Sequence, residues 1–221
     1  VKPVRDIAAE SLEVIPGVEL TAEFNSNEIH LLGYFIDLNN LRLENELDKF
    51  RQIRKRRVYD IVDRLKKLGV SLEPKEVFDF AGGESIGRLH IARALLAKGA
   101  VSIISEAFFK YIGSKGPAYV GKFSLTPQEG IALISEAKGI AVLAHPYSAN
   151  CDELIPSFIE AGLRGLEVFY PEHTESIRRY YLKIADKYGL LVTGGSDCHG
   201  SLKPNVGIGK VAIPYELVEK L

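Results

Sequence analysis

Hydrophobic and polar positions along this 221-residue chain alternate in blocks that predict strands and helices in turn. Residues 12–15 form a short β-prone run closed by Pro16 and Gly17, and residues 29–36 form a near-continuous apolar run typical of a buried strand. From position 126 the alternation becomes regular, with predicted strands at 140–144, 165–169 and 190–193 and predicted helices at 126–138, 152–161 and 174–188. Successive units of helix and strand favour an α/β fold with a parallel sheet and helical crossovers.

The middle of the chain has a different pattern. Residues 43–68 are strongly charged, and their apolar positions recur at helical spacing up to Gly69, a residue that commonly ends helices. Further helical stretches are predicted at 74–80, 88–98 and 103–112. We therefore expect 40–125 to be a mostly helical insertion or cap between two parts of one α/β domain, 1–39 and 126–221.

Composition narrows the class of protein. An apolar fraction of 46% and a charged fraction of 26% are ordinary for a globular chain, and a net charge of −1 gives no overall basic field for non-specific binding to nucleic acid or membranes. Cys151 and Cys198 are too few for a disulfide framework. The chain has no apolar run long enough to span a bilayer and no signal-peptide pattern, so we expect a cytoplasmic protein without membrane contact.

Side chains that commonly bind metals follow three of the predicted strands where each strand ends. They are Glu19 after the first strand, His145 after the strand at 140–144, and Asp197 and His199 after the strand at 190–193. The carboxyl edge of parallel strands is where α/β barrels and open α/β sheets place their active sites. Carboxylate and imidazole together suit Zn, Mn or Fe, and a bridging carboxylate can hold two such ions close together.

Each of these residues also has an alternative interpretation. His145 alone could be a satisfied polar residue at a strand end, and Glu19 could cap a helix. His30 lies inside the predicted strand at 29–36 and could be a buried histidine bonded to a backbone carbonyl. His173 begins a helix, where a solvated first turn and a place at the rim of the site are equally consistent with the sequence. Cys198, between two candidate ligands, is interpreted as a small core residue rather than a nucleophile.

The sequence contains neither a P-loop nor a dinucleotide-binding fingerprint. Gly82 and Gly83 lack the strand–turn–helix context of a P-loop or a dinucleotide fingerprint. The basic run RQIRKRR at 51–57 most often marks the solvated face of a helix. The functional alternative is a cap helix that attracts a phosphate-bearing or nucleic-acid substrate.

Four segments in order along the chain resemble successive motifs of the PHP (polymerase and histidinol phosphatase) family. They are VIPGVE at 14–19, IHLLGY at 29–34, VLAHP at 142–146 and TGGSDCHG at 193–200. The segment GRLHIA at 87–92 resembles the helical insertion of bacterial PHP phosphoesterases, some of which act on nucleotides or trim short RNA. The resemblance implies a distorted seven-stranded β/α (TIM-like) barrel with two or three divalent transition metals, Mn, Zn or Fe, at its carboxyl mouth.

The resemblance also implies a role for each matched residue. Glu19 would bridge two metals, His30 and His145 would bind the second, Asp197 the first and His199 the third. Arg88 and His90 on the insertion would be catalytic residues that hold the substrate phosphate, with His173 as a further candidate for substrate binding.

The match departs from the family at its start. PHP proteins begin with a strand carrying a His-x-His pair and a second strand ending in Asp-His, and neither is present here. The sequence starts at Val1 and contains no Met, so we expect the natural protein to have these strands upstream.

The expected activity is metal-dependent hydrolysis of a phosphate monoester or diester by metal-activated hydroxide, with a nucleotide or short single-stranded RNA as substrate. No obligate protein partner is expected. One alternative is a non-catalytic PHP-like structural module. Another is an amidohydrolase-like barrel that cleaves C–N bonds, although such barrels usually carry a metal-bridging Lys after a strand, and no Lys occupies that position here.

Overall fold

The computed structural model describes residues 13–25, 27–81, 86–121, 125–199 and 206–221. Contacts divide the chain into two compact units, one comprising Val1–Leu43 with Ser124–Leu221 and the other Glu44–Phe123. The first unit contains the sheet and the second is helical. Within the described residues, no helix combines the length and apolarity needed to cross a bilayer.

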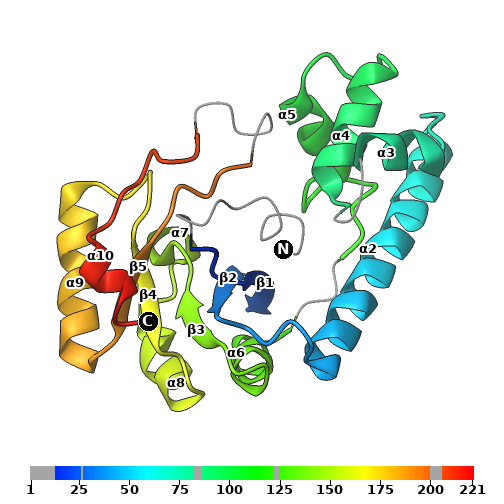
Figure 1. The fold of residues 1–221 in the computed structure, drawn as a ribbon. Coiled ribbons are helices and arrows are strands. Elements are labelled where there is room, and N and C mark those ends of the chain that lie inside the picture. The colour runs from blue at the N-terminus through cyan, green and yellow to red at the C-terminus, as the bar shows by residue number, and fades with distance from the viewer. Residues whose placement is uncertain (1–12, 26, 82–85, 122–124, 200–205) are drawn as a thin grey trace. The chain divides into compact units, whose positions relative to one another are not determined.

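The first unit is built on a five-stranded sheet in the order β1-β2-β3-β4-β5 (Figure 1). The pairs β1–β2 and β2–β3 are antiparallel, whereas β3–β4 and β4–β5 are parallel. The strands are β1 (Gly17–Phe24), β2 (Asn27–Tyr34), β3 (Ile140–Leu143), β4 (Gly165–Phe169) and β5 (Leu191–Gly194). The predicted parallel arrangement is therefore confirmed for the last three strands only.

Two of the sequence-based expectations for the sheet change. No strand forms at 13–16, and β1 begins at Gly17 instead, so Glu19 lies inside a strand rather than after one. The physical reason is that the residues after Gly17 pair with β2 along eight positions, from Gly17–Tyr34 to Phe24–Asn27, and form a hairpin. Five strands are present in the described part of the chain, so the expected seven-stranded barrel is not confirmed.

Helices of the first unit follow the sheet as the α/β pattern predicts. α6 packs against β1, β2 and β3, and α9 packs against β4 and β5; Figure 1 shows α6, α8 and α9 along the same side of the sheet. Thr126 caps α6 through a reciprocal capping box with Glu129, and Gly189 ends α9 at φ +64°. The helices are α6 (Pro127–Glu136), α7 (Pro146–Ala149), the 3₁₀ turn η2 (Asp152–Leu154), α8 (Ile155–Glu160), α9 (Glu175–Tyr188) and α10 (Tyr215–Val218).

The second unit has its own apolar core. The buried face of α2 contributes Val58, Ile61 and Leu65, which pack with Val77 of α3 and Leu95 of α4. The stretch predicted as one helix at 103–112 is split, because α5 passes directly into a π-helical segment. The elements are α2 (Leu41–Lys67), α3 (Pro74–Ala81), α4 (Arg88–Ala97), α5 (Ile104–Ala107) and η1 (Phe108–Ile112).

Candidate metal centre

Strand pairing brings Glu19, His30 and His145 together. His30 pairs with Thr21, two residues from Glu19, so the side chains of Glu19 and His30 project from the same face of the hairpin. The pair Leu31–Leu143 then aligns β2 with β3, and the backbone N–H of Ala144 donates to the His30 carbonyl at 3.0 Å. His145 follows at once, so its imidazole lies beside that of His30 although 115 residues separate them in sequence.

The ligand atoms of these three residues converge. His30 Nδ1 lies 2.9 Å from Glu19 Oε1 and 3.1 Å from His145 Nε2, and His145 Nε2 lies 4.0 Å from Glu19 Oε1. All three atoms fall within 4.8 Å of one another, close enough to share one cation. One carboxylate oxygen and two imidazole nitrogens form a donor set that suits Zn, Mn or Fe.

Hydrogen bonds behind the two imidazoles fix which nitrogen faces the centre. Ser148 Oγ donates to the His145 carbonyl at 2.9 Å, so it accepts from His145 Nδ1 at 2.7 Å, and the lone pair of His145 is on Nε2. His30 Nε2 lies 2.9 Å from Glu28 Oε1, and a carboxylate accepts. His30 Nδ1 donates in the same way to Glu19 Oε1 at 2.9 Å, so the metal-free ring carries both protons and a metal would replace the one on Nδ1. Partners of this kind hold metal-binding histidines in the productive tautomer and orientation.

The metal-free centre binds a proton strongly. Burial by itself lowers the pKa of His30, but hydrogen bonds to Glu19 and Glu28 and their negative charges outweigh it and raise that pKa to about 9. The hydrogen bond from His30 lowers the pKa of Glu19 in turn, against the effect of burial. Burial and the neighbouring charge on His30 both lower the pKa of His145. One positive charge is thus stabilised at the position where the three ligand atoms meet.

Asp197 and His199 form a second pair after β5. Tyr170 donates its hydroxyl to Asp197 Oδ2 at 3.1 Å, and the Asp197 side chain is near enough for its charge to act on Glu19 and His145. His199 Nδ1 donates to the Asp197 carbonyl at 2.7 Å, which leaves Nε2 as its free nitrogen. Neither residue belongs to the three-residue group of ligand atoms, and the Cys198 between them is exposed, not a core residue as expected.

Three residues of the site went unnoticed in the sequence. Glu28 lies two positions before His30 on the same face of β2, a spacing that could have identified it. Glu167 is a carboxylate in the otherwise apolar strand β4; it is 5% exposed and accepts from the His145 backbone N–H at 2.9 Å. Tyr170 bonds to Asp197 and lies with its ring 5.3 Å from that of His145. Nothing in the sequence around Tyr170 marks it.

Arg88 and His90 lie in the helical unit, at the start of α4. The Arg88 guanidinium lies over the rings of Phe108 and Tyr119, 5.8 and 5.6 Å from their centroids, and Nη1 is 3.4 Å from the Ile112 carbonyl. His90 Nδ1 accepts from the Gly87 N–H at 3.0 Å, so its proton is on Nε2. Burial lowers the pKa of His90.

His173 is neither in a solvated turn nor at an open rim. The side chain is buried, with 2% of the residue exposed, and Nδ1 donates to the Val168 carbonyl at 2.9 Å. Nε2 has no hydrogen-bond partner among the described residues. His173 belongs to a buried aromatic cluster between Tyr170 and Tyr181.

Comparison with known proteins identifies the family. No protein-family model matches the chain. The chain is 30% identical over 205 residues to a 3′,5′-nucleoside bisphosphate phosphatase of Chromobacterium violaceum, a match that covers 87% of this chain and 70% of that protein. This chain belongs to the PHP family. A further PHP relative, a 5′-3′ exoribonuclease of Haemophilus influenzae, is 30% identical over 201 residues, covering 88% of this chain and 73% of the relative.

Solved structures support the same conclusion for the fold. A protein from Bifidobacterium adolescentis, described as a metal-dependent phosphoesterase, superposes with a TM-score of 0.84 at 31% identity over 99% of this chain and 78% of its own. An amidohydrolase from C. violaceum, solved with sulfate and without metal, gives a TM-score of 0.78 at 27% identity over 93% and 76% of the two chains. This PHP protein is an enzyme, a metal-dependent hydrolase of phosphate esters.

Proposed function

We propose that this PHP enzyme hydrolyses the phosphate ester of a nucleotide or short oligonucleotide at a centre formed by Glu19, His30 and His145. The convergence of their three ligand atoms, with Glu28 and Ser148 orienting the two imidazoles from behind, is the observation that carries the proposal. Asp197 and His199 are the proposed further ligands, since Tyr170 and the Asp197 carbonyl orient them.

The donor set fits divalent transition metals. Two carboxylates raise the pKa of His30 to about 9, which supports a centre that favours positive charge, and a set of three protein ligands would leave room for substrate on a bound ion. We propose two or three ions of Mn, Zn or Fe, which Glu19, His30 and His145 would hold together with Asp197 and His199. Such ions supply Lewis acidity and a hydroxide nucleophile at neutral pH.

The protein side chains control the protonation and orientation of the two histidine ligands. His30 must lose its extra proton before it can act as a ligand, whereas the lowered pKa of His145 keeps its imidazole neutral and ready to bind. Glu28 and Ser148 hold the two rings in place, which limits the reorganisation needed when substrate enters.

Phosphate recognition is assigned to the helical unit. Arg88 carries a permanent charge, and its described contacts are aromatic rings and a backbone carbonyl rather than a carboxylate. We propose that it offsets the charge that grows on the phosphoryl oxygens, with the Nε2–H of His90 as a second donor.

The substrate class follows from the relatives, which are named for a nucleoside bisphosphate phosphatase, an exoribonuclease and a cyclic phosphate diesterase of a phosphoribosyl sugar. All three names refer to phosphate esters of ribose, and the nucleoside bisphosphate and the RNA also carry a base. We therefore propose ribose phosphate esters that bear a base as the substrates of this chain.

One experiment tests the proposal. We measure two properties of the wild type, Glu19→Gln, His145→Ala and the exposed control Glu160→Gln. The first is metal content by elemental analysis. The second is phosphate release from a nucleoside 3′,5′-bisphosphate and from a 5′-phosphorylated short RNA. We expect phosphate release by the wild type and the control, and loss of both bound metal and activity in the two site variants. Full activity in His145→Ala would overturn the site. Cleavage of a chromogenic amide instead of both esters would favour the C–N hydrolase suggested by the amidohydrolase neighbour.

A further inference from the structure

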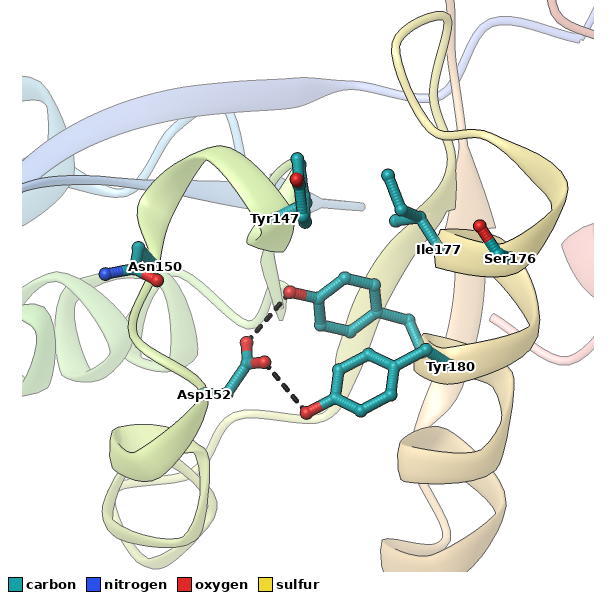
Figure 2. Close-up of a pocket in the computed structure, with 7 residues that line it drawn as sticks. Tyr147, Asn150, Asp152, Ser176, Ile177 and Tyr180 are labelled. Atoms are coloured by element: carbon teal, nitrogen blue, oxygen red, sulfur yellow. Dashed lines mark hydrogen bonds between the residues drawn. The ribbon is translucent and has the colours of Figure 1, made fainter.

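A pocket opens between the segment that follows His145 and the start of α9. Its volume is about 260 Å³, just below the range of roughly 300–1,000 Å³ that holds a drug-sized ligand. The pocket therefore has room for about one ring system rather than for a whole nucleotide. Seven residues line it (Figure 2): Tyr147, Asn150, Asp152, Ser176, Ile177, Tyr180 and Tyr181.

Two of these tyrosines present aromatic surface to solvent. Tyr147 is 60% exposed and Tyr180 is 49% exposed, so much of each side chain is accessible to a ligand. Both are held by buried rings, because Tyr147 lies edge-on to His173 at 6.4 Å and Tyr180 lies edge-on to Tyr181 at 5.1 Å. The aromatic surface is thus preorganised for a ligand ring.

The polar groups around the pocket favour an uncharged ligand group over an anionic one. Asp152 accepts hydrogen bonds from Tyr180 at 3.0 Å and from Tyr181 at 2.8 Å, so each of its oxygens has a phenol partner, as Figure 2 shows. None of the seven lining residues is Lys or Arg. The amide of Asn150 and the hydroxyl of Ser176 remain on the wall to donate to or accept from an uncharged heterocycle.

A row of aromatic rings links the pocket to the metal centre. The ring of Tyr170 lies 5.3 Å from that of His145 on one side and 5.3 Å from that of His173 on the other. His173 in turn stacks on Tyr181 at 5.8 Å and contacts Tyr147, which is only two residues from His145. A continuous row of rings therefore connects His145, a candidate metal ligand, to the pocket.

We propose that this pocket is a nucleobase site, in which Tyr147 and Tyr180 stack a base of the substrate whose phosphate ester is cleaved at the metal centre. The inference rests on the proposed function for its substrate class. Aromatic faces stack any base, while the single amide and hydroxyl give modest hydrogen bonding, so the site selects for the presence of a base rather than for its identity. The base belongs either to the nucleotide that is cleaved or to its neighbour in an oligonucleotide.

The test compares substrates with and without a base. We measure kcat/KM for a nucleoside monophosphate, for a 5′-phosphorylated short RNA and for ribose 5-phosphate, and divide each of the first two values by the third. These two ratios are compared among the wild type, Tyr147→Ala, Tyr180→Ala and Tyr147→Phe. The matched control is Tyr188→Ala, an exposed tyrosine of α9 that does not line the pocket. Binding of adenosine, followed by tyrosine fluorescence, is measured on the same proteins.

We expect each alanine variant to lower a ratio about tenfold, as loss of one stacking ring does, while Tyr147→Phe and the control keep it. If the ratio for the mononucleotide falls, the pocket binds the base of the nucleotide that is cleaved. If only the ratio for RNA falls, the pocket binds the base of the neighbouring nucleotide. Unchanged ratios in both alanine variants would overturn the nucleobase site and leave the phosphoesterase assignment intact. If the wild type hydrolyses none of the esters, the proposed function fails, and adenosine binding alone decides: binding lost in the alanine variants supports the site, and no binding overturns it.

Discussion

The backbone N–H of His145 donates to Glu167 Oε2 at 2.9 Å, so a buried carboxylate holds the main chain of a candidate metal ligand. His145 has φ +28°, a backbone conformation that non-glycine residues rarely adopt. This hydrogen bond helps to stabilise that conformation, which turns the imidazole toward His30 just after β3 ends.

Replacing Glu167 by Ala is expected to weaken metal binding. The N–H of His145 would lose its acceptor in a part-buried position, which costs at most about 1–3 kcal/mol of stability and frees the ligand to move. We expect metal affinity to fall by about 10–100-fold, as for other residues that orient ligands. Glu167→Gln keeps a carbonyl oxygen at the same place and should retain most of the affinity. Isothermal titration with Mn²⁺, with the melting temperature measured in parallel, checks this; equal losses in both variants would show that the carboxylate charge matters instead.

Tyr170→Phe isolates the hydroxyl that orients Asp197. The ring that packs between His145 and His173 is kept, so we expect little change in melting temperature. The lost hydrogen bond to Asp197 should lower kcat or metal occupancy about tenfold. Steady-state kinetics at saturating metal separate the two effects. Wild-type kinetics at limiting metal would contradict an orienting role.

Metal binding by this centre should strengthen as pH rises. Folding raises the pKa of His30 from 6.5 to about 9, so the metal-free protein holds a proton there that a metal must displace. Apparent affinity should therefore increase about tenfold per pH unit between pH 7 and 8 and level off near pH 9. Metal titrations at several pH values measure the slope.

The same proton affects the stability of the metal-free protein. Because the folded pKa is the higher one, the stabilisation is fully present below pH 6.5 and is lost as the pH rises to about 9. Glu28→Gln removes one of the two carboxylates that raise this pKa, so both pH dependences should shift to lower pH. Unshifted titration curves in that variant would show that Glu28 does not act on His30.

Arg88→Ala should impair turnover and leave the metals in place. The guanidinium is in the helical unit, and its described contacts are the rings of Phe108 and Tyr119 and the carbonyl of Ile112. We expect KM to rise or kcat to fall by at least about tenfold, since a permanent charge on the phosphoryl group is lost. Arg88→Lys should recover only part of the loss because it lacks the planar fork. Elemental analysis of the variants provides the control for metal content.

Local sequence signals predicted most of the helices and the later strands. Thr126 with Pro127 begins α6, Gly189 ends α9, and the apolar runs of β3, β4 and β5 were each found within about one residue. These signals act over a few neighbouring residues, so the sequence carries them directly. The early strand was misplaced because β1 depends on pairing with β2, which is a contact between segments.

The sequence by itself determined which residue types were available for the chemistry. The family motifs named Glu19, His30, His145, Asp197 and His199, and the ends of the later predicted strands pointed to His145, Asp197 and His199 as well. Only the tertiary structure decided which of them meet, since His30 and His145 become neighbours through the β2–β3 pairing across 115 positions. It also decided the environment of each, from the buried Glu167 to the hydroxyl of Tyr170. Side chains of distant segments set tautomer, charge and orientation, and no local pattern in the chain encodes those contacts.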